Sequence, residues 1–237
     1  MFRRLVSGSV FLVMALSVTG TAAGPVVQPA ICVAVSEGAL QVNQATVQGN
    51  ASLRSGSTVT ALASEVRVRL TNGASASLIS RSVAQFGGTA MELKAGGGVF
   101  ASSASYPVTA LGFDVRSEGG ARAKLYLDKG QLQVGALDGQ VMVHGREGIL
   151  VARVMPGKAL SLSPAPANDT SSTMTGTLAK SDDRWMLRDE VTNVNVELRG
   201  AALSGYVGKR IEVTGKALGA NGRADQVIEV ARLVPAP

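Results

Sequence analysis

The chain has 237 residues, of which 28 are glycine, one is cysteine and one is histidine, and only 17% are charged. The low charge and high glycine content exclude a helical bundle or coiled coil, which needs strong helix formers and charged residues at helical spacing. A single cysteine excludes a disulfide framework, and a single histidine excludes a multi-histidine metal cage. The 46% apolar content is enough to bury a core, so we expect a β-rich globular chain.

The first 23 residues have the order of a secretory signal peptide. Arg3 and Arg4 precede a short apolar run over residues 10–18, and small residues follow up to Ala23. The run is well short of the ~20 apolar residues that span a bilayer, so we expect cleavage after Ala23, with a retained membrane anchor as the alternative. The protein is then periplasmic or secreted, and its net charge falls from +6 to +4.

A segment rich in proline, serine and threonine divides the rest of the chain. Residues 164–173 show no strand pattern and have the composition of a linker. We therefore expect an N-terminal lead over 24–34, a first β domain over 35–163 and a second over 174–234. Neither domain carries a clustered basic stripe, and no nucleic-acid partner is expected.

In the first domain, apolar and polar residues alternate as they do in strands with one buried face. The clearest examples are residues 39–43, 65–70 and 123–127. Glycine pairs and triplets, including residues 96–98, are interpreted as turns, because glycine adopts positive φ at no steric cost. The last four turn glycines are nine residues apart: Gly130, Gly139, Gly148 and Gly157. This spacing predicts a meander or the stacked rungs of a short solenoid, and a β-sandwich with even hairpins is a third possibility.

Short motifs follow one another through this domain in a fixed order: G-A-L-Q-V-N at 38–43, L-R-S-G-S-T-V at 53–59, L-T-N-G-A at 70–74, L-K-A-G-G-G-V-F at 93–100, F-D-V-R-S at 113–117 and L-D-K-G-Q-L-Q-V at 127–134. In order and spacing, residues 35–164 resemble the FecR domain. The resemblance implies an all-β, solenoid-like periplasmic module. In its best-known members this module relays the state of an outer-membrane transporter to a cytoplasmic sigma factor.

Those FecR members carry a cytoplasmic anti-sigma segment and a retained transmembrane helix ahead of the domain. This chain differs from them, because only three residues precede Arg4 and its apolar segment has the features of a removable signal. We therefore expect an exported, stand-alone module rather than a direct regulator of a sigma factor.

The second domain shows five candidate strands, at residues 175–179, 184–189, 194–198, 210–215 and 226–233, with room for one helical turn over 201–208. This order resembles a small OB-fold barrel of the kind found in exported bacterial proteins. The strongest element of the resemblance is V-G-K-R-I-E-V-T-G at 207–215. The whole chain is thus expected to be all-β: a FecR-like solenoid or sandwich followed by a five-stranded OB-like barrel.

OB barrels bind oligomeric ligands on the face of their second and third strands, with aromatic side chains for stacking and cations for anionic groups. The candidate ligand-binding residues are accordingly Trp185, Tyr206, Lys209 and Arg210. Three of them have a plainer interpretation. Trp185 is expected to anchor the barrel core or mouth, and Lys209 and Arg210 are expected to form a solvated turn beside Glu212.

No residue set predicts catalysis, and no cofactor or metal site is expected. His144 follows an alternating strand on its polar side, with no serine, aspartate or cysteine motif beside it. It would need a pocket shared with a carboxylate and a hydroxyl to support an enzyme. Asp182 and Asp183 are interpreted as a polar turn, because a calcium site needs more oxygen ligands. Cys32 is interpreted as an inert thiol.

Two functions remain open. We expect a non-enzymatic protein that binds a protein or cell-envelope partner or acts as a scaffold. The alternative is a periplasmic accessory of a sigma-factor and anti-sigma signalling system, acting through a separate membrane partner.

Overall fold

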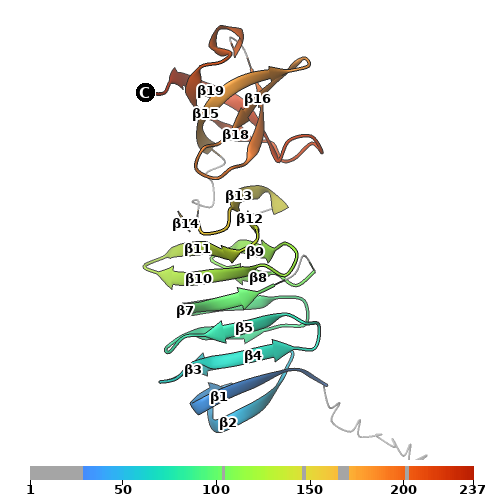
Figure 1. Ribbon diagram of the computed structural model, residues 1–237, viewed down its shortest axis with the longest axis vertical. Coiled ribbons are helices and arrows are strands. Elements are labelled where there is room, and N and C mark those ends of the chain that lie inside the picture. The colour runs from blue at the N-terminus through green and yellow to red at the C-terminus, as the bar shows by residue number, and fades with distance from the viewer. Residues whose placement is uncertain (1–28, 103–104, 146–147, 165–170, 201–202) are drawn as a thin grey trace, which may run out of the picture.

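The computed structural model describes residues 29–102, 105–145, 148–164, 171–200 and 203–237, and nearly all of its regular structure is β-strand. These residues form a 14-stranded sheet folded into two faces and a closed five-stranded barrel (Figure 1). The predicted all-β architecture is therefore confirmed. The predicted signal peptide lies outside the described residues, as do residues 165–170 of the predicted linker. Within the described part of the chain, no helix is long and apolar enough to cross a membrane.

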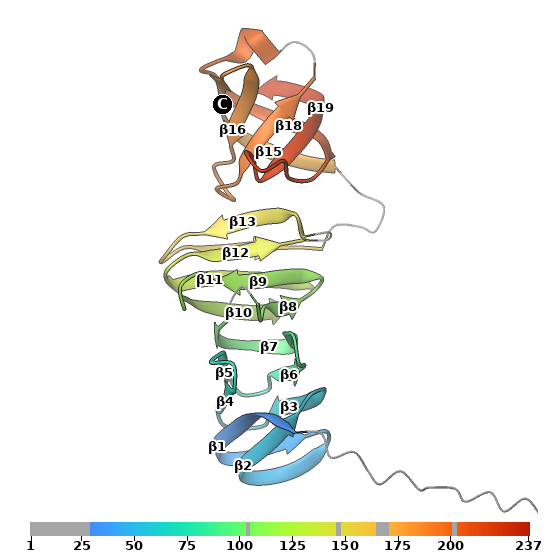
Figure 2. The ribbon, with the colours of Figure 1, turned by 90° about the vertical axis from the view of Figure 1, so that its right-hand side faces the viewer.

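The large sheet takes its strands from the first two thirds of the chain: β1 (Ala30–Val42), β2 (Ala45–Arg54), β3 (Ser57–Ala61), β4 (Val66–Leu70), β5 (Ser75–Leu78), β6 (Val83–Phe86), β7 (Met91–Ala101), β8 (Val108–Ala110), β9 (Phe113–Ser117), β10 (Arg122–Asp128), β11 (Gln131–Asp138), β12 (Val141–His144), β13 (Leu150–Val154) and β14 (Ala159–Leu162). Figure 2 shows these strands stacked along the long axis of the molecule, with β1 and β2 at one end and the barrel at the other.

Two strands are long enough to take part in both faces. In β1, Cys32–Ser36 pairs with β4, whereas Leu40–Val42 pairs with β3. In β7, the first half pairs with β6 and β8 and the second half pairs with β5 and β10. We call the face with β4, β5, β10, β11 and β14 face A, and the face with β3, β6, β8, β9, β12 and β13 face B. We refer to this two-faced unit as the sandwich.

One hydrophobic core fills the space between the two faces. Alternation positions its side chains, as in β4, where Val66, Val68 and Leu70 are buried while Arg67 and Arg69 face solvent. The largest fully buried side chains come from both faces and include Leu78, Phe86, Met91, Phe100 and Leu125. Burying each such side chain contributes about 1.5–3 kcal/mol, so the two faces stabilise each other through this shared core.

The glycine triplet at residues 96–98 was expected to form a turn. It lies instead within β7, at the point where this strand passes from one face to the other. Gly96 has a φ of +70°, which bends the strand. The fully buried Ser82 hydroxyl accepts a hydrogen bond from the Gly97 amide at 2.9 Å and donates one to the Gly97 carbonyl at 2.7 Å. A Cβ at Gly98 would collide with the Ser77 carbonyl oxygen of β5. The glycines are therefore required by close packing within a strand.

A similar serine stabilises the bend in β1. The Ser36 hydroxyl lies 3.0 Å from that of Ser64, donates to the Glu65 carbonyl at 3.2 Å and accepts from the Gly38 amide at 3.3 Å. A Cβ at Gly38 would lie 2.7 Å from the Ser64 oxygen. Both bends therefore combine a glycine with a buried serine that satisfies the backbone groups released from the ladder.

The four glycines at nine-residue spacing all adopt positive φ, between +68° and +78°, as expected for turns: Gly130, Gly139, Gly148 and Gly157. The strands between them do not form a meander. The β10–β11 hairpin lies in face A, the β12–β13 hairpin lies in face B, and β14 returns to face A. The chain thus alternates between faces and builds a flattened stack, which combines the solenoid and sandwich alternatives.

Two predicted boundaries are wrong. β1 begins at Ala30, inside the predicted lead 24–34. Its start was missed because residues 31–35 carry apolar side chains on both sides of the strand and lack the period-two signal. Val33 and Val35 are indeed exposed by 44% and 46%. β15 begins at Ser171, inside the predicted linker 164–173, where a polar cross-strand contact between Thr173 and Thr214 at 3.0 Å replaces apolar pairing.

The C-terminal barrel closes in the order β15-β16-β17-β19-β18, with only the β17–β19 pair parallel. Its strands are β15 (Ser171–Ser181), β16 (Arg184–Arg188), β17 (Asn195–Arg199), β18 (Arg210–Ala217) and β19 (Gln226–Pro235). The short 3₁₀ helix η2 (Leu203–Tyr206) lies between β17 and β18. The five predicted strands and the helical turn are confirmed, and the arrangement is that of an OB-like barrel.

The close packing at the β7 bend predicts a contrast between two glycines of the sandwich. Gly98→Ala pushes a methyl group into the backbone of β5, and we expect the free energy of unfolding to fall by roughly 1–3 kcal/mol. Gly135→Ala in β11 meets nothing closer than 3.7 Å and is expected to be neutral or slightly stabilising. Urea unfolding followed by circular dichroism measures both. Equal effects of the two substitutions would contradict the close approach at β7.

Candidate functional site

Trp185 lies on β16, opposite Leu198 of β17, and its half-buried ring packs against the barrel core. The Lys180 ammonium lies 5.5 Å from the ring centroid, within the range of a cation–π contact. The ring is therefore held between the barrel interior and a lysine, as expected for an anchor at the barrel mouth.

Tyr206 and Lys209 form a second pair of this kind. Tyr206 closes η2 and packs against the same core, and the Lys209 ammonium lies 5.5 Å from its ring centroid. The Lys209 amide also donates to the Tyr206 carbonyl at 2.9 Å, which makes a tight turn before β18. The interpretation of Lys209 as a turn residue agrees with this geometry.

Arg210 is engaged elsewhere. Its guanidinium binds both carboxylate oxygens of Glu190, with nitrogen–oxygen distances of 2.8–3.1 Å, and also donates to the Pro237 carbonyl. Hydrogen bonding from Arg210 lowers the pKa of the Glu190 carboxyl. Each of the four predicted ligand residues thus already has a contact within the barrel, and Arg210 belongs to a different cluster from the two aromatic residues.

The other sequence candidates do not converge on a catalytic arrangement. His144 is half-buried at the end of β12, its Nδ1 has no hydrogen-bond partner, and burial together with the charge of Arg116 lowers its pKa. Burial raises the pKa of the Cys32 thiol to about 11, so the thiol stays protonated at neutral pH. Asp183 lies 4.0 Å from Lys180 in an exposed turn. Over the described ranges, no three histidine, cysteine, aspartate or glutamate residues are placed to hold a metal ion.

A polar cluster that the sequence did not predict lies around Glu197, whose side chain is only 8% exposed. One carboxylate oxygen accepts from Arg184 at 3.1 Å and from Asn221 at 2.5 Å, and the other accepts from Arg199 at 3.1 Å. These residues come from β16, β17 and the loop between β18 and β19. Burial raises the pKa of Glu197, but the bonds from Asn221 and Arg199 and the charge of Arg184 outweigh it, and the pKa is lowered.

This cluster is on the second and third barrel strands, where OB folds bind ligands. The Arg184 and Arg199 side chains remain 39% and 57% exposed, so each guanidinium keeps donors free for a ligand while Glu197 holds it in place. Two oriented guanidinium groups on adjacent strands suit a ligand rich in carboxylate, phosphate or hydroxyl oxygens. Glu197 and Arg199 are two residues apart, so the sequence places them on one face of a strand. The contact from Asn221, which lies in the loop that covers this face, could not be inferred from spacing.

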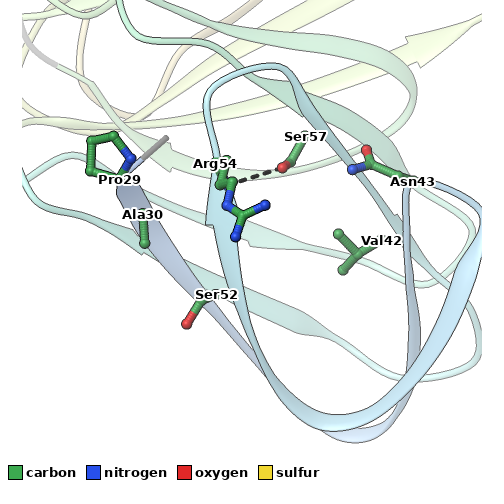
Figure 3. Close-up of a pocket in the computed structure, with 7 residues that line it drawn as sticks. All are labelled: Pro29, Ala30, Val42, Asn43, Ser52, Arg54 and Ser57. Carbon is green, nitrogen blue, oxygen red and sulfur yellow. Dashed lines mark hydrogen bonds between the residues drawn. The ribbon is translucent and has the colours of Figure 1, made fainter. Parts of the chain in front are cut away.

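A half-open cavity of about 350 Å³ lies at the opposite end of the molecule, where β1 and β2 curl around a hollow (Figure 3). Figure 3 shows the Arg54 side chain between Ala30 and Val42. The Arg54 amide donates to the Ser57 hydroxyl at 3.0 Å. Within the described residues, the Arg54 guanidinium has no ion-pair partner.

Comparison with known proteins adds no family to this description. No protein-family model matches the chain, and no curated protein matches it either.

The lowered pKa of Glu197 predicts a pH dependence of barrel stability. A carboxyl with a depressed pKa contributes stability that is complete above its unfolded pKa and is lost as pH falls through the folded pKa. We expect the wild-type barrel to lose stability on acidification below the ordinary glutamate range, and Glu197→Gln to reduce that loss. Thermal unfolding across acidic pH measures this. The matched control is Glu212→Gln, and an equal flattening of the pH profile by both variants would contradict the role of Glu197.

Proposed function

We propose that this chain is an exported, non-enzymatic binding and scaffold protein of the bacterial envelope, in which a FecR-like sandwich holds an OB-like barrel in a fixed position. Export is supported by the signal-like order of the first 23 residues. The scaffold role is supported by the junction between the two units, because a scaffold must present its binding surface at a defined distance and angle.

The last strand of face B supplies part of the barrel core. Leu150 at the start of β13 is buried in the same hydrophobic cluster as Leu178, Val196 and Ile228 of the barrel, and Met142 of β12 packs against it. The barrel cluster thus takes in one buried side chain of the sandwich, whereas the sandwich core forms a cluster of its own. The packing of Leu150 into the barrel cluster is the observation on which the proposed scaffold role depends.

Polar contacts complete the junction. The Arg153 guanidinium of β13 binds both oxygens of Asp225 at 2.6 Å, and the same carboxylate accepts from the Asn195 amide at 2.9 Å. The Arg153 amide donates to the Thr192 carbonyl at 2.7 Å, so the barrel covers the free edge of β13. Gln226, which is 4% exposed, donates to the Leu150 carbonyl at 2.6 Å. A bidentate pair with backbone support restricts rotation about the connection.

The junction predicts that the sandwich and the barrel unfold together. Arg153→Ala leaves Asp225 partly buried without its cation, and we expect a loss of about 1.5–3 kcal/mol together with a splitting of the calorimetric transition into two. Arg122→Ala removes an exposed ion pair with Asp138 that is not part of the junction and is expected to leave one transition. Differential scanning calorimetry distinguishes these outcomes, and two transitions in the wild type would contradict coupling of the two units through this junction.

The binding role is tested by affinity capture from envelope extracts of a bacterium that expresses the protein. We expect the wild type to retain envelope glycan or outer-membrane material, and Arg184→Gln with Arg199→Gln to lose it because the oriented guanidinium groups are gone. Arg67→Gln with Arg69→Gln on β4 removes the same charge from the sandwich and is expected to retain the material. Circular dichroism of each variant verifies that it folds.

Two results of this capture would change the proposal. Retention of a membrane-bound anti-sigma regulator would replace it with the signalling alternative. Equal retention by the wild type and by both double variants would show that the barrel face does not bind.

A further inference from the structure

The strand at the end of the sandwich farthest from the barrel has an open edge. In the part of the chain that the structure describes, β2 is ten residues long and pairs with β1 alone. Residues 45–53 of this strand include no charged residue and no proline. Proteins usually block such an edge with lysine, proline, a covering loop or a very short strand, because unpaired ladder groups recruit another strand. The edge strand β14, by contrast, is only four residues long.

β2 is bent in the same way as β1. Gly49 has a φ of +74°, and the register with β1 shifts between Val35 and Ala39. The arm 45–48 therefore continues face B, and the arm 50–54 continues face A. A strand that joins this edge must bend close to the same place, which a straight peptide does not do.

A second copy of β2 can pair with this edge so that the core-facing sides of the two strands lie on the same face of the sheet. With Asn50 opposite Asn50 of the second copy in antiparallel pairing, Val47 lies opposite Leu53, and Gly49 lies opposite Ala51. Val47, Ala51 and Leu53 point toward the core side, whereas Thr46, Gln48, Asn50 and Ser52 are exposed. Core-facing residues thus meet core-facing residues, as the period of two requires. A two-fold axis through Asn50 exchanges the two arms, and it places the bend at Gly49 of each copy opposite Ala51 of the other, so the two bends lie two residues apart on either side of the axis.

The charges also permit this pairing. Arg54 is the one charged residue of β2, and in this register it lies opposite the uncharged Thr46 of the second copy, not opposite another arginine. The edge is about 30 Å long at ~3.3 Å per residue, which allows a continuous ladder.

We propose that two copies of this protein associate head to head through antiparallel pairing of their β2 edges, which places the two barrels at opposite ends of the dimer. This proposal is independent of what the barrel binds, and its tests do not use a ligand.

The pair between Thr46 and Arg54 gives the first test, by analytical ultracentrifugation of the full chain without its signal peptide. Thr46→Glu creates two symmetry-related ion pairs with Arg54 and is expected to lower the dimer dissociation constant by about 2- to 30-fold, whereas Thr46→Lys is expected to raise it by a similar factor. Ser161→Lys on the exposed side of β14 is the control and is expected to leave the dissociation constant unchanged.

The register itself is tested by cross-linking. Asn50→Cys places two thiols directly opposite each other, within the reach of a disulfide, and we expect a covalent dimer on oxidation. Gln48→Cys lies opposite Ser52, about 13 Å along the strand from its own copy, and we expect no covalent dimer. Cys32 is buried and remains in both variants as a shared background.

A wild type that stays monomeric at every concentration measured would overturn the proposal. This holds even if the β2 edge proves to pair with a strand of a different protein. A dimer that responds equally to Thr46→Glu and Thr46→Lys, or one in which Gln48→Cys cross-links as well as Asn50→Cys, would also overturn it. Circular dichroism of each variant separates a lost interface from a lost fold.

Discussion

The structure depends on the passage of β7 from one face of the sandwich to the other. At this bend the strand releases backbone groups from the ladder, and the buried Ser82 hydroxyl satisfies both the amide and the carbonyl of Gly97. Gly98 then fits against β5 without a side chain. Because the two halves of β7 pair with β6 and β8 and with β5 and β10, this one strand fixes the register of four neighbours and encloses the core between the faces.

The stacked arrangement has consequences for both ends. The end formed by β13 is covered, because Leu150 enters the barrel core and Arg153 binds Asp225. The opposite end, formed by β2, is uncovered within the described residues. A sheet that does not close on itself leaves terminal edges. In this molecule the β13 edge carries the barrel, and the β2 edge is where we place a second copy, so both proposals follow from the same architecture.

Short-range sequence patterns predicted the strands with alternating polarity and the turns that contain glycine. Alternation located β4, and the positive φ of Gly130 and Gly139 was expected from their turn positions. The same rules misread the glycines at 96–98 as a turn, because a glycine required by close packing within a strand looks identical in sequence to one required by a turn. The start of β1 was missed because its side chains are apolar on both sides.

The candidate site was less predictable, because its residues are brought together by folding. Trp185 and Tyr206 could be selected by type, and both pack on the barrel core. The Glu197 cluster depends on Asn221, which arrives from a loop 24 residues away, and no periodicity signals such a contact. Long-range polar contacts of this kind follow from topology, which the sequence pattern does not encode at the level of single side chains.

The most direct measurement of the central claim is native-state hydrogen exchange of the Gly97 amide, compared with amides of β5 and β10. If the Ser82 contact couples the two faces, the Gly97 amide exchanges only with the global unfolding of the sandwich, together with those strands, and Ser82→Ala lowers the protection of all three. Rapid exchange of the Gly97 amide in the wild type, while β5 and β10 remain protected, would show that residues 96–98 behave as an ordinary turn and would contradict this account.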